Sequence, residues 1–181
     1  MNVAPAIVVG YSGGAIIALE VALKRPDLIA RLILLDPAVN LRRCLTPAFV
    51  RILATVKVLS WLRRDRAAAE SWLRYVSSYP VGSCAFDAKA SSGRREQLLT
   101  NVDGMFADLA SGGGTIDERL LSNISVPVTI VDARLSPPFL RRSSHRLKER
   151  LPEARKVTLE HSGHWIALDA RDDMLKILRD A

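Results

Sequence analysis

The sequence is poor in cysteine, and it lacks any long apolar run. Its two cysteines, Cys44 and Cys84, fit no zinc-binding or redox spacing, so we expect free thiols in a reducing compartment. No uninterrupted apolar stretch reaches the length needed to span a bilayer. The first residues also lack the basic, apolar and small-residue segments of a signal peptide. We therefore expect a cytoplasmic protein with no metal or other cofactor.

Acidic residues are outnumbered by basic ones. The chain has 26 Lys and Arg against 19 Asp and Glu, which gives a formal net charge of +7. A basic protein can meet nucleic acid or anionic lipid. Here, however, the excess is spread over short clusters with no interleaved aromatic residues. Such clusters are typical of solvated helix faces, and we expect no nucleic-acid partner. The clusters are Arg42-Arg43, Arg63-Arg64, Arg94-Arg95 and Arg141-Arg142.

The composition is that of a folded domain. Of 181 residues, 49% are hydrophobic and 25% are charged, which supplies a real core and argues against disorder. The length fits one compact domain, with at most one inserted subdomain.

The N-terminal segment has the pattern of a β-α-β unit. Residues 6–9 are a short β-branched run that is apolar on both faces, as in a buried strand. After a Ser-Gly-Gly turn, a largely apolar helix runs to about Lys24 and is ended by Pro26. A second apolar strand follows at 32–35. This succession predicts an α/β fold with a parallel sheet.

The rest of the chain divides into two parts. Residues 40–122 predict an all-helical insertion, with helices near 49–59 and 67–76 and joints at 91–93 and 111–114. The α/β pattern then resumes. Its expected elements are a strand at 126–131, a basic helix at 141–151, a strand at 156–159 and a closing helix at 172–178. We therefore expect three segments, 1–39, 40–122 and 123–181, of which the first and third form one core.

Gly10-Tyr11-Ser12-Gly13-Gly14 matches the Gly-x-Ser-x-Gly nucleophile elbow. In such an elbow the serine occupies a strained strand-to-helix turn, so the residues two positions away must be small. The same turn places the Gly13 amide at a helix N-terminus, where it can donate to an oxyanion. The alternative is a glycine-rich turn that serves packing or a phosphate, although the Gly-Lys-Ser/Thr ending of a phosphate-binding loop is absent.

A serine nucleophile needs a base, and the chain has three histidines. His145 lies in the basic helix and is expected on the surface. His161 and His164 both follow the last strand, on the loop that should rise beside the elbow. We choose His164 as the base and keep His161 as the fallback. The order of a serine upstream and a histidine near the C-terminus fits the α/β-hydrolase arrangement.

Four segments together resemble the α/β-hydrolase superfamily, in its esterase, lipase and dehalogenase-like branch. They are the elbow with Pro26-Asp27-Leu28, Leu34-Leu35-Asp36-Pro37-Ala38, Ile124-Ser125-Val126-Pro127-Val128, and Ser162-Gly163-His164-Trp165. The resemblance implies a partial α/β-hydrolase fold from the elbow strand onward, with residues 40–122 as a helical cap over the substrate pocket. It also implies a serine hydrolase acting on a carboxylic ester or related acyl substrate. The apolar residues of the cap favour a hydrophobic acyl group.

The acid of the implied triad is displaced. Members of the family usually place it just past the seventh strand, which here falls near Ser136. Some relatives take it from the end of the sixth strand, where Asp36 stands, and Asp132 at the tip of the seventh strand is the other candidate. Either carboxylate could orient a histidine, and an Asp before Pro could instead cap a turn.

The elbow strand would normally follow four other strands, but nine residues precede Gly10. We therefore expect this strand to form a bare, apolar sheet edge. We therefore expect the chain to be a fragment of a longer gene product, the result of a wrongly assigned start, or a decayed copy. The competing hypothesis is accordingly a truncated, non-catalytic remnant or interaction protein, whose sheet is completed by a second copy or a partner chain.

A third hypothesis places the Phe49–Leu62 helix and its flanking arginines on a membrane surface. We favour a role for its hydrophobic face as the roof of the pocket, and so expect no membrane partner.

Overall fold

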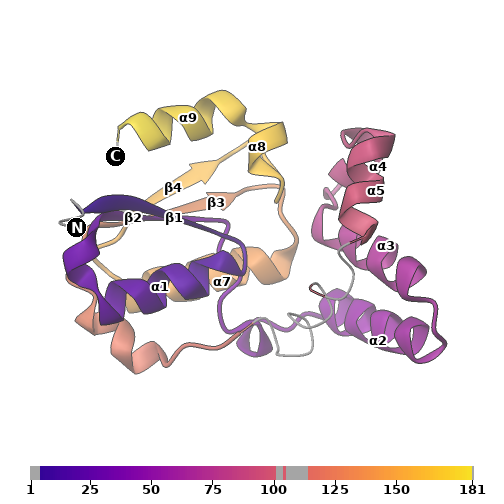
Figure 1. Cartoon of the computed structure of the whole chain (residues 1–181), viewed down its shortest axis with the longest axis horizontal. Coiled ribbons are helices and arrows are strands. Elements are labelled where there is room, and N and C mark those ends of the chain that lie inside the picture. Colours follow the sequence, from indigo (N-terminus) through magenta and orange to yellow (C-terminus); the bar gives the residue numbers. More distant parts are fainter. Residues whose placement is uncertain (1–4, 101–103, 105–113, 181) are drawn as a thin grey trace.

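The computed structural model describes residues 5–100, 104 and 114–180. Its centre is a four-stranded sheet in the order β1-β2-β3-β4 (Figure 1). The strands are β1 (Ala6–Tyr11), β2 (Ile29–Leu35), β3 (Val128–Ala133) and β4 (Arg155–Leu159). Each neighbouring pair is parallel. The predicted β-α-β unit and parallel sheet are confirmed, with β3 starting two residues later than expected.

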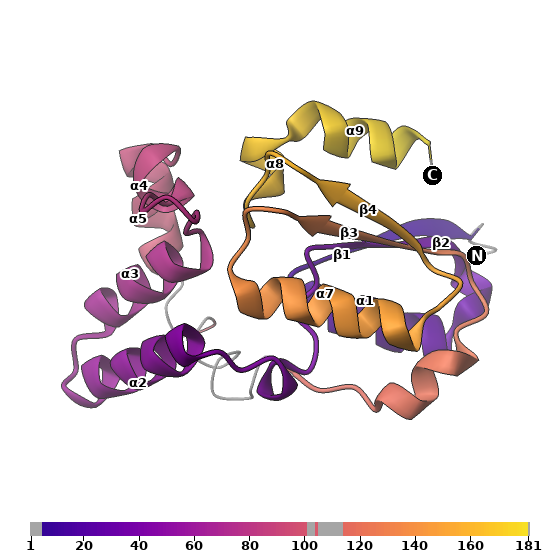
Figure 2. The ribbon, with the colours of Figure 1, turned by 180° about the vertical axis from the view of Figure 1, so that it is seen from behind.

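Helices cover both faces of the sheet, which explains why β2 and β3 are apolar on both sides. On one face lie α1 (Gly14–Lys24) and α7 (Pro138–Arg150), and on the other lie α8 (Ile166–Asp169) and α9 (Arg171–Arg179) (Figures 1 and 2). Every residue of β3 is buried. Two apolar clusters result. One lies between the sheet and α1 with α7, and the other packs the opposite face against α9.

Strand β1 lies at an edge of the sheet, and no other strand of the described residues pairs with its outer side. Ile7, Val9 and Tyr11 are 42–45% exposed. Because side chains alternate along a strand, these three share one face. The expected bare, apolar edge is therefore confirmed.

Within the described residues, four helices form a separate layer, named here the helical insertion, beyond the carboxyl ends of the strands (Figure 1). They are α2 (Pro47–Trp61), α3 (Asp65–Val76), α4 (Ala85–Ala88) and α5 (Ser92–Thr100). The two predicted helices are present. The joint expected at 91–93 is wrong, because Ser91 Oγ accepts the Arg94 N–H and α5 begins there. Most of the joint expected at 111–114 lies outside the described residues. None of the described helices is long and apolar enough to cross a membrane.

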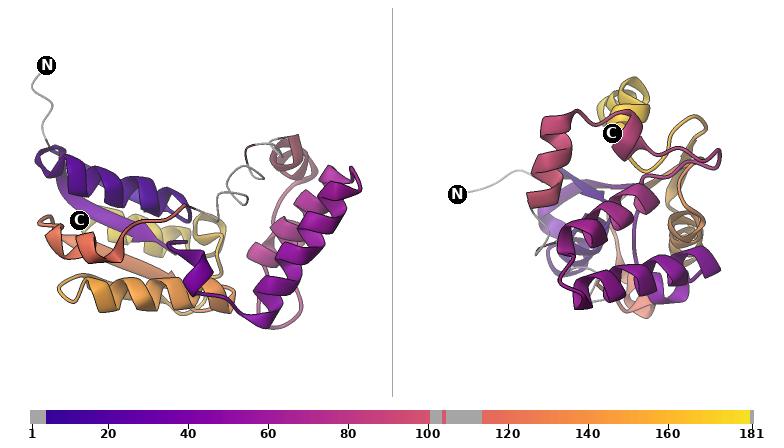
Figure 3. Two further views of the ribbon diagram at one scale, coloured as in Figure 1. Left: turned by 90° about the horizontal axis from the view of Figure 1, so that it is seen from below. Right: turned by 90° about the vertical axis from the view of Figure 1, so that its right-hand side faces the viewer.

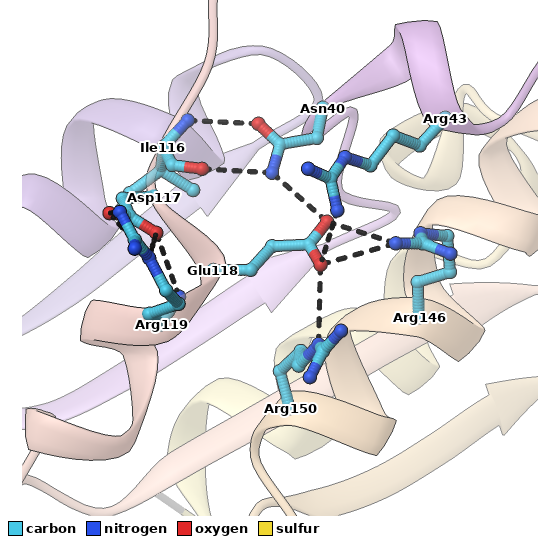
Figure 4. Close-up of polar contacts among 8 residues, drawn as sticks. All are labelled: Asn40, Arg43, Ile116, Asp117, Glu118, Arg119, Arg146 and Arg150. Atoms are coloured by element: carbon cyan, nitrogen blue, oxygen red, sulfur yellow. Dashed lines mark hydrogen bonds and ion pairs between the residues drawn. The ribbon is translucent and has the colours of Figure 1, made fainter.

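Short 3-10 helices connect these elements at Pro26–Leu28 (η1), Leu41–Arg43 (η2) and Glu118–Asn123 (η3). Two contacts hold the ends of the insertion together (Figure 4). Asn40 has a left-handed backbone (φ 49°), and its amide both accepts the Ile116 N–H and donates to the Ile116 carbonyl, each at 2.9 Å. The chain that leaves the sheet after β2 is thereby tied to the chain that returns to it.

Glu118 makes the second contact. Its side chain is 10% exposed and pairs with three arginines, at 3.3 Å (Arg43), 3.1 Å (Arg146) and 3.2 Å (Arg150) (Figure 4). Burial alone would raise the pKa of this carboxyl, but hydrogen bonds from Asn40 and Arg146 outweigh it and the pKa is lowered. Glu118 is therefore a charged tie between η3, η2 and α7.

Candidate active site

Ser12 stands in the turn between β1 and α1 and is half-buried. Its backbone is left-handed (φ 52°), a conformation that costs energy in any residue with a side chain. Three backbone hydrogen bonds hold it there. The Ser12 N–H donates to Leu35 O at 3.0 Å, and Ser12 O accepts the N–H groups of Ala38 (3.0 Å) and Ala15 (3.1 Å). The turn is thus fixed to the end of β2 as well as to α1.

The glycines around Ser12 differ in how much space a side chain would have. A Cβ at Gly10 would lie 2.8 Å from both Ala15 Cα and Ala18 Cβ, so α1 crosses directly over this position. At Gly14 nothing lies within 4 Å of an added Cβ, so the expectation that this site must lack a side chain is wrong for the described chain. Gly13 is the N-cap of α1, and its N–H makes no bond to another described backbone group.

His164 lies on the loop between β4 and α8, and it is 4% exposed. Its Nδ1 is 2.7 Å from Asp36 Oδ2. Because a carboxylate only accepts hydrogen bonds, Nδ1–H donates to it, which leaves Nε2 with the free lone pair. A buried imidazole with this tautomer can act as a base through Nε2.

Asp36 directly follows β2 and is fully buried, again with a left-handed backbone (φ 40°). The Ser136 hydroxyl donates to the same Oδ2 at 2.6 Å, and the Ala133 N–H lies 3.4 Å from Oδ1. Ser136 lies in the loop after β3, the position expected to carry the acid of the superfamily. The structure therefore brings both possible acid positions together, and Asp36 holds the carboxylate.

Asp132 does not reach His164. Its carboxylate accepts from Thr158 Oγ1 at 2.7 Å and pairs with Lys156 Nζ at 3.2 Å. Its neighbours Val131 and Ala133 face the α9 side of the sheet, so Asp132 points to the opposite side. The structure joins Asp36, and not Asp132, to the histidine.

The other two histidines stay on the surface. His145 is exposed as expected and lies 3.4 Å from Glu149, whereas His161 is exposed at the start of the loop that carries His164. Among the described residues, no hydrogen bond joins Ser12 Oγ to the His164 ring. Such bonds are often long in the absence of substrate and tighten when it binds.

Tyr11 connects the two sides of the site and is missing from the sequence prediction. Its ring stacks on the His164 imidazole with centroids 5.0 Å apart, and its hydroxyl donates to the His164 carbonyl at 2.7 Å. Burial of the hydroxyl, with added repulsion from Asp36 and Asp169, raises the pKa of Tyr11. The phenol therefore remains a neutral donor that positions the loop.

Asp169, which the sequence also did not predict, holds the same loop through the backbone of Gly163. The Asp169 side chain is 1% exposed and accepts three donors, which are the Gly163 N–H (2.7 Å), Tyr79 Oη (2.7 Å) and Lys89 Nζ (2.5 Å). Tyr79 and Lys89 belong to the chain of the helical insertion, so this carboxylate ties the insertion to the residue before His164. A Cβ at Gly163 would lie 2.7 Å from the Tyr79 ring, which explains the glycine. In the sequence, the glycine directly before His164 is the one signal that could have indicated this close contact with Tyr79.

Two surface grooves of about 730 and 660 Å³ lie away from Ser12, Asp36 and His164. The first runs beside α7 and β4 over Asp132, and the second lies within the helical insertion around Tyr79 and Cys84. Burial raises the pKa of the Cys84 thiol, as it does for Cys44. Neither groove is lined by Ser12 or His164. No group of three or more potential metal ligands is found within the described ranges.

Comparison with known proteins agrees with this fold. A sequence model described as the alpha/beta hydrolase family matches residues 2–177. Among solved structures, an α/β hydrolase enzyme from a Medee basin deep-sea metagenome library is 23% identical, with a TM-score of 0.73 over 99% of this chain and 65% of that one. A lipase-esterase related protein from Clostridium acetobutylicum is 16% identical, with a TM-score of 0.72 over 98% and 66%.

A carboxylesterase from Bacillus subtilis is 13% identical, with a TM-score of 0.68 over 99% of this chain and 60% of that one. At these identities the likeness shows a shared fold. The chain spans 60–66% of the length of these three structures.

Proposed function

The chain belongs to the α/β hydrolase family, and on that premise we propose that it is a serine hydrolase acting on a carboxylic ester or related acyl substrate. The family and the partial fold predicted from four sequence segments are confirmed. The activity rests on the site. Its central support is the buried Asp36–His164 pair at 2.7 Å, which lies at the ends of two strands beside the strained Ser12 turn.

In this proposal Ser12 is the nucleophile and His164 is the general base. His164 Nε2 accepts the Ser12 hydroxyl proton as Oγ attacks the acyl carbon, and the carbonyl oxygen becomes an oxyanion. The Gly13 N–H, at the start of α1, donates to that oxyanion. His164 then returns the proton to the leaving alkoxide. A water molecule, activated by the same nitrogen, releases the acid and restores Ser12.

Asp36 orients the imidazole and stabilises it when it becomes charged. Full burial of the carboxylate strengthens this interaction, because no water screens it. The Ser136 hydroxyl occupies a second lone pair of the same oxygen and fixes its direction. Asp132, committed to Thr158 and Lys156, has no role in this proposal.

The helical insertion favours a hydrophobic acyl group. Phe49 of α2 stacks on Phe139 at the start of α7, with centroids 4.2 Å apart, and Trp72 and Tyr75 of α3 join them. The part of the insertion that packs against the start of α7 is therefore built of aromatic and aliphatic side chains.

The proposal is tested with p-nitrophenyl esters of increasing acyl length and with two histidine variants. We expect His164→Gln to abolish turnover and His161→Gln, three residues earlier on the same loop, to leave it near the wild-type rate. Ser12→Ala should match His164→Gln. The proposal is wrong if Ser12→Ala or His164→Gln, shown by circular dichroism to be folded, keeps the wild-type rate.

One observation favours a second candidate, a non-catalytic interaction protein that pairs with another copy of itself along β1. Its support is the apolar edge of Ile7, Val9 and Tyr11. In this case light scattering after size-exclusion chromatography should find a dimer that Val9→Lys converts to a monomer. A monomeric wild-type protein that turns over esters would contradict it.

A further inference from the structure

Helix α2 is apolar on two opposite faces. The inner face is buried, because Phe49 packs with residues of α3 and α7 and Val56 is 6% exposed. The outer face carries Val50, Val58 and Trp61, of which Trp61 is 81% exposed and Val58 is 54% exposed. A helix that is apolar all round is normally buried on all sides. The sequence led us to expect a single hydrophobic face, and the structure shows a second one in solvent.

The outer face is a continuous stripe. At ~100° per residue, the positions of Val50, Ala54, Val58 and Trp61 fall within about 80° of one another around the helix. Leu45 before the helix and Leu62 after it are also about half exposed. Figure 3 shows α2 along the outer edge of the helical insertion. Contiguous exposed apolar surface of this kind marks an interaction site.

The charge along α2 and in the segment before it is of one sign, and the nearest carboxylate in the sequence is Asp65, which follows Arg64 and accepts a hydrogen bond from Ser60 Oγ at 3.1 Å. Residues 37–64 contain no Asp or Glu, and they include six basic residues. The same helical spacing places Lys57 and Arg51 at the two borders of the stripe, and Arg63 and Arg64 follow at its end. All four are exposed, and none forms an ion pair within the described ranges. The six basic residues are Arg42, Arg43, Arg51, Lys57, Arg63 and Arg64.

We propose that this outer face of α2 docks the protein on the surface of a bilayer that contains anionic lipids. The helix would lie in the interfacial plane, with Val50, Val58 and Trp61 among the acyl chains and headgroups. Tryptophan is enriched at that depth, because its ring is apolar and its N–H is polar. Arg51 and Lys57 would extend along the helix to reach lipid phosphates on either side.

Charge complementarity favours a lipid surface over a second copy of this chain. A two-fold contact through α2 would bring the same cluster of cations against itself, with no carboxylate in residues 37–64 to offset it. Anionic headgroups supply the missing negative charge. This inference is independent of the proposed catalysis, because binding to lipid does not require turnover.

The test is co-sedimentation with vesicles of phosphatidylcholine alone or with roughly a third phosphatidylglycerol. We expect binding to the anionic vesicles only, weakened by salt, together with a blue shift of tryptophan emission. Arg51→Glu/Lys57→Glu should lower the partition coefficient at least ~10-fold. The matched control Arg94→Glu/Arg95→Glu changes the net charge equally on α5 and should leave most of the binding.

A second variant isolates the apolar contribution. Trp61→Ser should reduce binding and abolish most of the blue shift, while the circular dichroism spectrum stays unchanged because Trp61 is on the surface. The proposal is overturned if folded protein ignores both vesicle types, or if the two charge-reversal pairs reduce binding equally. It is also overturned if Trp61→Ser instead dissociates a dimer, which would place a second copy on this face.

Discussion

Replacing Asp36 by asparagine changes one atom of the proposed site and nearly none of its volume. Asp36 Oδ2 is shared by His164 Nδ1 at 2.7 Å and Ser136 Oγ at 2.6 Å. Asparagine can still accept one hydrogen bond, but it carries no charge and offers an N–H where an oxygen stood. The imidazole then loses the partner that keeps the proton on Nδ1 and that stabilises the imidazolium.

The expected loss is large. A triad aspartate changed to asparagine typically lowers kcat about 10⁴-fold, which corresponds to about 5 kcal/mol of transition-state stabilisation. Burial of Asp36 places the effect at the upper end, because water cannot replace the missing charge. Asp132→Asn is the matched control, since Asp132 is also buried but bonds to Thr158 and Lys156. We expect it to keep ester hydrolysis near the wild-type rate.

The geometry also predicts a rescue. A carboxylate at position 136 would extend one bond beyond the present Ser136 oxygen, which already lies beside Asp36 Oδ2. We expect Asp36→Asn/Ser136→Asp to hydrolyse p-nitrophenyl esters at least ~10-fold faster than Asp36→Asn alone, a recovery of about 1.4 kcal/mol. The reasoning is refuted if Asp36→Asn is folded and keeps wild-type kcat, or if Asp132→Asn is the more damaging of the two single changes.

Three further predictions concern the framework of the site. Gly10→Ala should destabilise the fold by about 1–3 kcal/mol in urea unfolding because α1 fills the space, whereas Gly13→Ala, which meets open space, should cost far less. Glu118→Gln should cost about 1–2 kcal/mol at neutral pH. The folded pKa of Glu118 lies below its ordinary value of 4.5, so this difference should vanish as the pH falls through the lowered pKa, and urea midpoints against pH would show it. Asp169→Asn should lower kcat more than it changes KM, by ~10-fold or more, because the His164 loop loses its charged anchor; an unchanged kcat would assign Asp169 to stability alone.

The strands and the two key loops could be predicted from the sequence because each depends on local patterns. Short apolar runs bounded by Gly, Asp-Pro and Pro predicted the parallel sheet. The Gly-x-Ser-x-Gly pattern predicted the turn that holds Ser12. These features need only neighbours in sequence and the period of each element.

The choice of acid could not be predicted, because it depends on which way a side chain points at the end of a strand. Asp36 and Asp132 both end apolar strands, and only the alternation of β3 sends Asp132 away from His164. The roles of Tyr11 and Asp169 were hidden for a similar reason. Tyr11 reaches the His164 loop from a distant strand by bonding to a backbone carbonyl, and Asp169 bonds to a backbone N–H of the same loop. No residue spacing in the sequence indicates either contact.

For α2 the apolar residues were visible in the sequence, but their burial could not be predicted. Only the packing of Phe49 against α3 and α7 shows which face is buried, and it leaves Val50, Val58 and Trp61 outside.

The central claim, that Ser12 is a nucleophile activated by the buried Asp36–His164 pair, is most directly tested by active-site labelling. The folded protein is treated with a fluorophosphonate probe, and the modified peptide is identified by mass spectrometry. We predict a single adduct on Ser12, formed rapidly in the wild type and at least ~100-fold more slowly in His164→Gln. Folded protein that leaves Ser12 unmodified, or that labels it equally fast without His164, would contradict the claim.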